Sequence, residues 1–414
     1  MKIGLQAWGS EGDVRPVVAL AVGLRRAGHE VRLDLTPVDG TDYAKVCAAA
    51  GVALRLIPEK LEVALHTYAD SARRLDPLKV SRDLVARAFN PYLDAFYEAA
   101  LQLCEWSDVV VWHYSCWYTL AAALKTGRPH AAVHLFPGLA PTRYAPPPGM
   151  PDLGRLNRML WSLARPALDL QFRKRPAQFF AARGLPPIRH VLPDLMFSTY
   201  MNLHAASPVL LPRPPDWDAH HHVPGQFTLP SDAEPWRPAA GLQAFLDDGP
   251  PPALLSLGSM EHLAPQRARD LLIGAARHAG VRAIVQTKRS GEEGRDGALY
   301  FLPWAPHEAL LPRCSMAVHH GGAGTTHAVL RAGIPAVIVP FIFEQQAWGD
   351  RLRVAGAAPK LVGFWKATAT GLGERIKEVA ASEPLRLRAR VLGAEISREE
   401  GVQRAMALLE SLGL

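Results

Sequence analysis

A glycine-rich loop between two apolar segments constrains the fold of this chain more than any other feature. The short apolar segment 316–318 is followed at once by HHGGAGTT (319–326), and a helical pattern then runs to Arg331. A second apolar segment, 335–340, is followed by FIFEQQ (341–346), which supplies an acid and amides. A strand, a glycine loop and a helix start predict an α/β unit that offers backbone N–H groups and a positive helix end to a phosphate.

The rest of the chain repeats the alternation of strands and helices in two blocks. In the first block, apolar segments 2–8, 31–35 and 52–57 alternate with helical patterns 14–27 and 43–50. Strands 108–112, 130–136 and 203–206 and helices 78–103 and 118–125 extend that block. The second block has strands 253–256, 283–286 and 299–301, a helix 266–278, and terminal helices from about residue 371. Such alternation is typical of parallel sheets with crossover helices, as in Rossmann-like domains.

Composition shifts set the expected domain boundaries within the 414 residues. Residues 1–227 should form an N-terminal domain, residues 228–242 a proline-rich linker, and residues 243–414 a C-terminal domain, whose last helix could pack back on the first. The proline- and glycine-rich segment 137–151 should be a loop, and long ordered loops often bind ligands. The helical region 153–183 carries Trp161, Leu163, Leu168, Leu170 and Phe172, which helical spacing assigns to the core.

Charge and cysteine usage exclude several classes of protein. The formal net charge of +7 is mild, and no dense basic block is interleaved with aromatic residues, so we expect no nucleic-acid partner. The tightest basic cluster, 173–175, should be a solvated helix face that could also contact an anionic membrane surface. Four scattered cysteines without a C-x-x-C pair indicate a reducing, cytoplasmic compartment. The N-terminus lacks a signal-peptide pattern, and no apolar run is long enough to span a bilayer.

The segment 304–350 resembles the donor-binding signature of GT-B fold UDP-glycosyltransferases. The sterol and glycopeptide-antibiotic branches are the most similar in sequence. Their usual VHHGGAGTT, Asp-Gln and Phe-Trp-Gly are nearly matched here by VHHGGAGTT (318–326), Glu344-Gln345 and AWGD (347–350), after Trp304-Ala305-Pro306. The resemblance covers nearly the whole chain. It implies two Rossmann-like domains facing across a cleft. The implied donor is a UDP- or dTDP-sugar, and neither a cofactor nor a metal ion is expected.

The same resemblance assigns roles to individual residues. His320 and Ser259, with the loop residues Gly322, Gly324 and Thr325, should hold the diphosphate. Trp304 should stack on the base, a role that suits a flat aromatic face. Ala305 and His307 belong to the nucleotide site, as do Ser10 and Gly12 in the first-strand loop. Glu344 and Gln345 should bind the sugar hydroxyls.

Asp13 is the expected general base. It stands in G-D-V-R-P, where plant-type relatives have a catalytic His and the sterol and glycopeptide-antibiotic branches have Asp. Local sequence by itself favours a helix N-cap before Pro16, and the two roles are compatible. No partner of Asp13 can be assigned. Asp108 should serve in a turn, and His113, which follows a strand, is a cleft candidate that more often merely packs.

Two departures from the family pattern bear on the donor. Glu344 replaces the usual Asp, so the sugar should sit differently or be a different sugar. Glu11 replaces the usual Arg of sterol-type sequences, which removes a cation near the phosphates. Ala328 stands where plant-type enzymes have the glutamate that binds the ribose, so UDP and dTDP both stay open.

Two sequences imitate metal sites. Asp216-Trp217-Asp218 spells the D-x-D of metal-dependent glycosyltransferases, but it lies among prolines and should be a turn. The run His220-His221-His222 cannot converge on one ion from consecutive positions. We therefore expect no metal ligands.

The sequence thus predicts a metal-independent, inverting glycosyltransferase that acts on a hydroxyl of a lipophilic acceptor, either a natural product or a sterol-like lipid. The aromatic-rich segments 112–118 and 136–144 motivate the choice of acceptor class. A nucleotide-sugar 2-epimerase and a non-catalytic auxiliary protein on the same fold are the alternatives. Sugar, acceptor and oligomeric state stay open.

Overall fold

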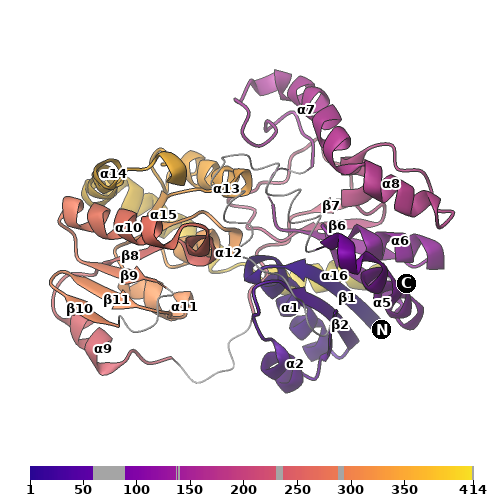
Figure 1. Ribbon diagram of the computed structural model, residues 1–414, viewed down its shortest axis with the longest axis horizontal. Helices are drawn as coiled ribbons and strands as arrows, with labels where there is room; N and C mark the ends of the chain where they lie inside the picture. The colour runs from indigo at the N-terminus through magenta and orange to yellow at the C-terminus, as the bar shows by residue number, and fades with distance from the viewer. Residues whose placement is uncertain (59–88, 137, 139, 230–235, 288–292, 413–414) are drawn as a thin grey trace. The chain divides into compact units, whose positions relative to one another are not determined.

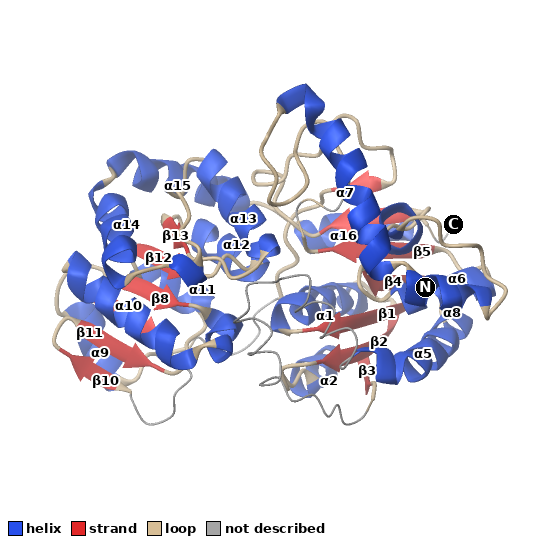
Figure 2. Cartoon of the chain, turned by 45° about the horizontal axis from the view of Figure 1, so that its top comes forward, coloured by secondary structure: helices blue, strands red, loops and turns tan. Residues whose placement is uncertain are grey.

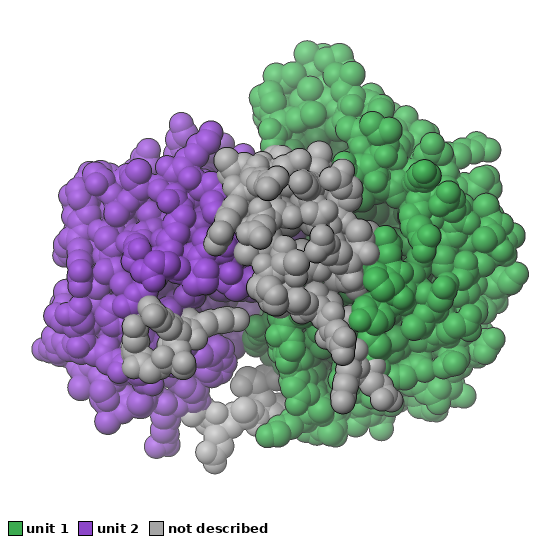
Figure 3. Space-filling model, viewed as in Figure 1, with its two compact units in different colours: residues 1–65, 78–230, 400–414 green, residues 66–77, 231–399 purple. Residues whose placement is uncertain are grey.

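The computed structural model describes residues 1–58, 89–136, 138, 140–229, 236–287 and 293–412. They form two compact units, each with its own sheet (Figures 1 and 3). One unit takes in the described residues of 1–65, 78–230 and 400–414, and the other takes in those of 231–399. Both are α/β units built on mainly parallel sheets, as Figure 2 shows. The predicted fold class is therefore confirmed.

The first unit is organised by a seven-stranded parallel sheet in the order β3-β2-β1-β4-β5-β6-β7. Its strands are β1 (Lys2–Gly9), β2 (Glu30–Pro37), β3 (Ala53–Leu56), β4 (Val109–His113), β5 (His130–His134), β6 (Met201–His204) and β7 (His221–His222). Seven of the eight residues of β1 and all residues of β4 and β5 are buried. Continuous apolar strands of this kind suit a parallel sheet whose two faces are both covered.

Helices cover the faces of this sheet. They are α1 (Glu11–Arg26), α2 (Ala44–Ala50), α5 (Leu93–Trp106) and α6 (Trp117–Thr126), with α7 (Asn157–Phe172) and α8 (Lys174–Ala181) further along the chain. The chain's last helix, α16 (Gly401–Glu410), also belongs to this unit and packs against α1. Val402, Ala405 and Leu409 of α16 are buried in the same apolar cluster as α1, and His29 Nε2 lies 3.0 Å from Glu410 Oε1.

The second unit has a six-stranded sheet in the order β10-β11-β9-β8-β12-β13, parallel except for β10. Its strands are β8 (Ala253–Ser256), β9 (Ala283–Gln286), β10 (Gly294–Asp296), β11 (Leu299–Leu302), β12 (Met316–His319) and β13 (Ala336–Ile338). Its helices are α9 (Ala240–Asp247), α10 (Pro265–Ala279), α11 (His307–Leu310), α12 (Ala323–Arg331), α13 (Phe343–Val354), α14 (Ala369–Ala381) and α15 (Glu383–Ile396).

The first helix begins earlier than the sequence predicted. The expected start at residue 14 is wrong, because α1 begins at Glu11 with Ser10 as its N-cap in extended conformation. Asp13 is therefore the third residue of the helix and not its N-cap, and Pro16 lies inside the helix. Serine is a strong N-cap in its own right, so the helix can begin as soon as β1 ends.

The helical region after residue 153 differs from expectation in its packing. Trp161 is buried as predicted, but Leu163 is 65% exposed and Leu170 is 88% exposed, so their assignment to the core is wrong. The part of the predicted helix 78–103 before residue 89 lies outside the described residues, and the remainder appears as α5. Among the described residues, no helix combines the length and the apolar character that crossing a bilayer requires.

Three histidines at the ends of strands β5 and β6 are buried in the first unit. His134 ends β5 and is registered with His204 at the end of β6; their rings stack with centroids 4.9 Å apart. Burial lowers the pKa of His134 to about 3 and that of His130, which begins β5, to about 4. Both ring nitrogens of His130 lack a hydrogen-bond partner among the described residues. These side chains are therefore neutral in the folded protein at neutral pH.

His130 should make the fold sensitive to acid. The unfolded chain binds a proton at His130 below about pH 6.5, whereas the folded chain does so only near pH 4. Above pH 6.5 His130 is neutral in both states and does not affect the free energy of unfolding. As the pH falls from about 6.5 towards 4, the unfolded chain binds a proton that the folded chain does not, so the folded state loses stability. The His130→Phe substitution removes the titration without removing a hydrogen bond. Relative to wild type, the variant should gain up to about 2 kcal/mol between pH 7.5 and pH 5 in urea denaturation; an unchanged pH dependence would contradict this.

Candidate active site

The two glycine loops of the second unit meet at one edge of its sheet. Strand β8 is followed by Gly258 and Ser259, and the neighbouring strand β12 is followed by the loop His320–Gly322. The two strands pair in parallel, with Ser256 opposite His319, so both loops leave from their carboxyl ends. The strand order reverses at this pair, since β9 lies beyond β8 and β13 beyond β12. Crevices at such switch points are where open α/β sheets bind ligands.

His320 lies between these loops in a space that two glycines provide. A Cβ at Gly322 would come within 2.4 Å of His320 Nε2, and one at Gly258 within 2.9 Å of its Cε1. Gly258 also has a φ of +57°, which favours glycine. The two glycines therefore make room for the imidazole of His320.

Both histidines of the loop are neutral at pH 7. Burial lowers the pKa of His320 to about 4, and the neighbouring His307 adds to the effect. Burial also holds the pKa of His319 well below its ordinary value. The Gly321 N–H donates to His319 Nδ1 over 3.1 Å, which places the proton of His319 on Nε2. The loop thus offers hydrogen bonds from neutral imidazoles and no fixed positive charge of its own.

The start of α12 supplies the remaining donors. Gly322 is the extended N-cap, so the backbone N–H groups of Ala323, Gly324 and Thr325 belong to the first turn. First-turn N–H groups have no carbonyl partner within the helix, and the helix dipole makes this end favourable for an anion. The predicted residues His320, Gly322, Gly324 and Thr325 therefore lie together at this edge, beside the loop of Ser259.

Gln345 of α13 lies beside the same loop, and Glu344 precedes it in the chain. The side-chain oxygen of Gln345 accepts a hydrogen bond from the Phe341 N–H at 2.8 Å, and the residue is buried. This bond fixes the orientation of the amide and leaves its NH₂ group as a donor. A Cβ at Gly321 would lie 2.7 Å from the Gln345 carbonyl oxygen, which ties the glycine loop to the start of α13. Glu344 is half-buried in the first turn.

The segment after β11 presents a flat aromatic surface. Trp304 is 64% exposed, whereas Ala305 beside it is buried. His307 begins α11 and is close enough to His319 and His320 to lower the pKa of both. His307 therefore lies near the glycine loop, and the exposed indole of Trp304 leaves an aromatic face open to stacking.

In the first unit, Asp13 is held by the end of β1. One carboxylate oxygen, Oδ2, accepts hydrogen bonds from the Ser10 N–H and the Ser10 hydroxyl, each at 2.9 Å. Gly9 has a φ of +142°, and a Cβ there would lie 2.4 Å from Asp13 Oδ2. Serine and glycine thus fix the carboxylate and make room for it, while Oδ1 is left for other partners. Gly12, also predicted for the site, is exposed in the first turn of α1.

The partner that the sequence left open is His113. Strands β1 and β4 are neighbours at the switch point of this sheet, so the last residue of β4 lies beside the residues that follow β1. His113 Nε2 is 3.9 Å from Asp13 Oδ1, and no described group makes a hydrogen bond to this nitrogen. The other nitrogen, Nδ1, lies 2.7 Å from Ser115 Oγ. Burial lowers the pKa of His113, against the opposing effect of the Asp13 charge.

The sequences that imitate metal sites have structural roles. Asp216 lies in a turn, where its carboxylate accepts hydrogen bonds from Thr142 Oγ1 at 2.6 Å and from the Arg143 N–H at 2.9 Å. The ring of His221 stacks on that of His204, with Nδ1 3.0 Å from His204 Nε2. Asp108, for which the sequence predicted a turn role, accepts a hydrogen bond from the Lys2 N–H at 2.8 Å. Within the described ranges, no three His, Cys, Asp or Glu side chains are arranged to hold a metal ion.

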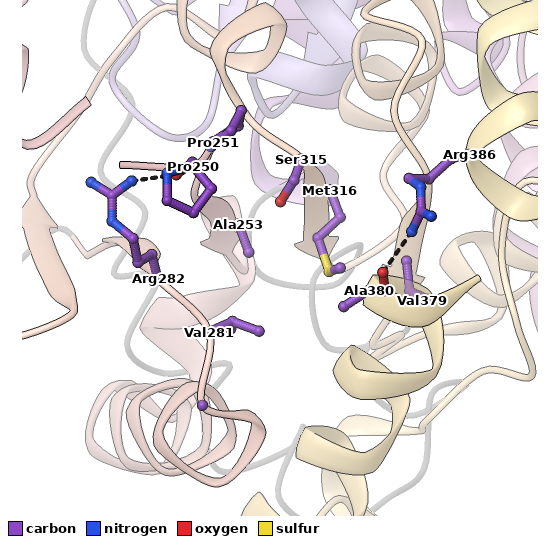
Figure 4. A pocket seen from close by; sticks show the side chains of 11 residues that line it. Pro250, Pro251, Ala253, Val281, Arg282, Ser315, Met316, Val379, Ala380 and Arg386 are labelled. Carbon is purple, nitrogen blue, oxygen red and sulfur yellow. Dashed lines mark hydrogen bonds between the residues drawn. The ribbon is translucent and has the colours of Figure 1, made fainter. Parts of the chain in front are cut away.

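A cavity of about 330 Å³ lies at the opposite edge of the second sheet (Figure 4). It is lined by Ala253 and Met316, the first residues of β8 and β12, and by two arginines. Arg282 donates to the Pro250 carbonyl and Arg386 to the Ala380 carbonyl, so both guanidinium groups serve the local backbone. The cavity is therefore separate from the glycine loops, which leave the carboxyl ends of the same strands.

Sequence reasoning missed three residues that shape the two sites. Gly9 and Gly258 make room for Asp13 and His320, and His113 was considered without being assigned a role. A glycine at the end of a buried strand, or within two residues of it, could have signalled both close approaches. The His113 contact has no local signal, since it depends on the pairing of β1 with β4.

Known proteins similar to this chain are glycosyltransferases. The O-mycaminosyltylonolide 6-deoxyallosyltransferase of Streptomyces fradiae is 32% identical over 99% of this chain and 97% of its own length. Glycosyltransferase GtfE of Amycolatopsis orientalis is 33% identical over 86% of this chain and 85% of its own. Sterol 3-beta-glucosyltransferase UGT80B1 of Arabidopsis thaliana is 27% identical over 98% of this chain and 67% of its own.

A family model and solved structures agree with these relatives. The model of the erythromycin biosynthesis protein CIII-like C-terminal domain matches residues 282–405. The glycotransferase of kitacinnamycin superposes with a TM-score of 0.73 at 20% identity, covering 100% of this chain and 99% of its own. Glycosyltransferase VinC, solved in complex with DTDP, has a TM-score of 0.67 at 20% identity, covering 100% and 99%.

The space around His320 gives a direct test of the glycine loop. The Gly322→Ala substitution places a methyl group against the imidazole and should displace it. Losing a hydrogen bond to a charged ligand costs about 1.5–3 kcal/mol, so binding of a nucleoside diphosphate should weaken about 10- to 100-fold in calorimetry. Gly363→Ala is the matched control, because its Cβ would meet nothing within 4 Å and its φ is −58°. Equal affinities of the Gly322→Ala variant and wild type would remove His320 from the site.

Proposed function

The chain belongs to the GT-B glycosyltransferase family that includes macrolide, glycopeptide-antibiotic and sterol glycosyltransferases, and from this we propose its reaction. It moves a sugar from a UDP- or dTDP-sugar to a hydroxyl group of a lipophilic acceptor, either a natural product or a sterol-like lipid. The relatives' names support this acceptor class, and the DTDP complex of VinC supports a nucleoside diphosphate donor.

The observation that carries the proposal is the pair of glycine loops around His320. A diphosphate leaving group needs hydrogen-bond donors that are already in place when its charge develops. The first-turn N–H groups of α12 and the neutral His320 ring supply such donors. The NH₂ group of Gln345 can bind a sugar hydroxyl beside them. The exposed face of Trp304 suits the base of the nucleotide.

Asp13 is the proposed general base of the reaction. Its Oδ1 takes the proton of the acceptor hydroxyl while the acceptor oxygen forms a bond to the anomeric carbon. The bond from that carbon to the diphosphate oxygen breaks in the same displacement, and the diphosphate departs with the electron pair. One displacement inverts the anomeric configuration. The Ser10 hydrogen bonds on Oδ2 support this role, because they fix the carboxylate and leave Oδ1 to face the acceptor.

His113 is the proposed positioning residue behind this base. When the Ser115 hydroxyl donates to Nδ1, the ring carries its proton on Nε2, the atom that faces Asp13 Oδ1 at 3.9 Å. A separation of 3.9 Å is too long for a hydrogen bond, and a small movement of either side chain on acceptor binding would form one. A neutral imidazole in this position orients the carboxylate and stabilises its anionic form before the proton is taken.

Substitutions of the pair test both roles. Asp13→Asn keeps the shape and the Ser10 contacts but removes the base, so kcat should fall about 10²- to 10⁴-fold while donor affinity is kept. His113→Gln should lower kcat by roughly tenfold and change the pH–rate profile. Because the two side chains act as one unit, the double variant should be about as slow as Asp13→Asn alone.

The matched control for this cycle is Asp194→Asn. That carboxylate, like Asp13, accepts two hydrogen bonds on one oxygen in the first unit, here from the backbone N–H groups of Arg189 and His190. Its variant should turn over at the wild-type rate. Near-normal turnover by folded Asp13→Asn protein would remove the assigned base, and fully additive losses in the double variant would remove the link to His113.

The proposal also specifies the stereochemistry and the metal requirement. Backbone N–H groups and the helix dipole can stabilise the departing diphosphate, so turnover should persist in excess EDTA. Proton NMR of the product should show the anomeric configuration opposite to that of the donor. Activity restored by Mg²⁺ after EDTA treatment, or a retained configuration, would contradict these statements. Conversion of the donor to an epimer in an acceptor-free control would indicate the 2-epimerase reaction instead.

A further inference from the structure

One side of helix α7 carries large apolar side chains that are exposed. Leu156, just before the helix, and Met159, Leu163 and Leu170 within it are 56%, 50%, 65% and 88% exposed. Their spacing of three, seven and fourteen residues puts all four on one helical face. Figures 1 and 2 show α7 standing out from the sheet of its unit. We call these four residues the α7 stripe.

The opposite side of the helix is firmly attached to its own unit. Trp161 is buried and its indole N–H donates to the Ala145 carbonyl at 2.9 Å. Asn157 is also buried, and its side-chain amide donates to Asp152 Oδ1 at 2.8 Å. Near the other end, Asp169 accepts a hydrogen bond from the Val191 N–H at 2.7 Å. The α7 stripe is therefore a second apolar face, held outward by the packing of the first.

Basic residues accompany the α7 stripe. Residues 153–176 contain six basic side chains and a single acidic one, a net charge of +5, whereas the whole chain carries +7. By helical position Arg155 and Arg173 lie on one flank of the stripe, whereas Arg158 and Arg165 lie on the side of Trp161, and Lys174 and Arg175 follow at the end of the helix. Within the described chain, Arg155 and Arg173 make no ion pair. Most of the net positive charge of the protein is thus concentrated on the segment that carries the α7 stripe.

From this arrangement we propose that α7 docks in the plane of an anionic lipid bilayer. A helix with an apolar face, a basic flank and no length to span the membrane lies in the interface, with its apolar side chains among the acyl chains. Each Lys or Arg near an anionic surface adds to the attraction, and their aliphatic stems can cover apolar surface as well. A protein partner of ordinary composition or a second copy of this +7 chain would not complement the charge of this flank. An enzyme docked in this way would meet a lipophilic molecule where it partitions.

Vesicle sedimentation tests the proposal with the full chain. Vesicles of phosphatidylcholine and phosphatidylglycerol in a 3:1 ratio should bind the protein at low salt at least tenfold more tightly than vesicles of phosphatidylcholine alone. The Leu163→Ser/Leu170→Ser double variant and the Arg155→Gln/Arg173→Gln double variant should each weaken this binding at least tenfold. All four side chains are exposed, so both variants should keep the melting temperature of wild type.

The matched control is Leu387→Ser/Val391→Ser, an exposed apolar pair one turn apart on α15 in the other unit, which should bind vesicles like wild type. The proposal is overturned if wild type does not sediment with anionic vesicles, if it binds neutral vesicles equally well, or if the α15 pair is as damaging as the α7 pair. It is also overturned if the Leu163→Ser/Leu170→Ser variant turns a dimer into a monomer in light scattering. A raised KM for the acceptor in vesicle-free assays, with unchanged sedimentation, would reassign the stripe to acceptor binding. These readouts do not depend on which sugar or acceptor the enzyme uses.

Discussion

Parallel pairing of two strands in each sheet is the constraint on which both sites depend. Strand β1 lies beside β4, and β8 lies beside β12, at the points where the strand order reverses. Because parallel strands point the same way, the segments that follow each pair leave from one edge of the sheet. Asp13 and His113 meet at one such edge, and the loops of Ser259 and His320 meet at the other. Without this pairing, nothing would bring Asp13 close to His113, about 100 positions away in the chain, or Ser259 close to His320, about 60 positions away.

Both sites are built by letting a polar side chain approach a backbone that has no Cβ. Gly9 makes room for the carboxylate of Asp13, and Gly258 with Gly322 makes room for the ring of His320. The consequence in the second unit is a buried, neutral imidazole, since burial lowers its pKa to about 4. Neutral donors in fixed positions can bind a diphosphate and still release it, because they add no permanent positive charge to the loop.

In the first turn of α1, the two oxygens of one carboxylate have different surroundings. Oδ2 of Asp13 is engaged by Ser10, and Oδ1 lies toward His113. Local sequence set two interpretations of Asp13 against each other, a structural residue at a helix start and a catalytic group. The two are compatible, because each can use a different carboxylate oxygen. Its structural role differs in detail from an N-cap, because Ser10 takes that position and Asp13 reaches back to it from the third residue of the helix.

The sequence alone determined the alternation of strands and helices, the two sheets and the glycine loops, and it named most of the candidate site residues. These features depend on short-range periodicity and on residue types that a local backbone requires, so neighbouring residues suffice to predict them. Only the tertiary structure decided that His113 stands behind Asp13, that His320 is wedged between glycines of two loops, and that Leu163 and Leu170 face outward. Each of these depends on which strand pairs with which, or on which side of a helix finds a surface to cover. Helical spacing shows that a face is apolar, but only packing decides whether anything covers it.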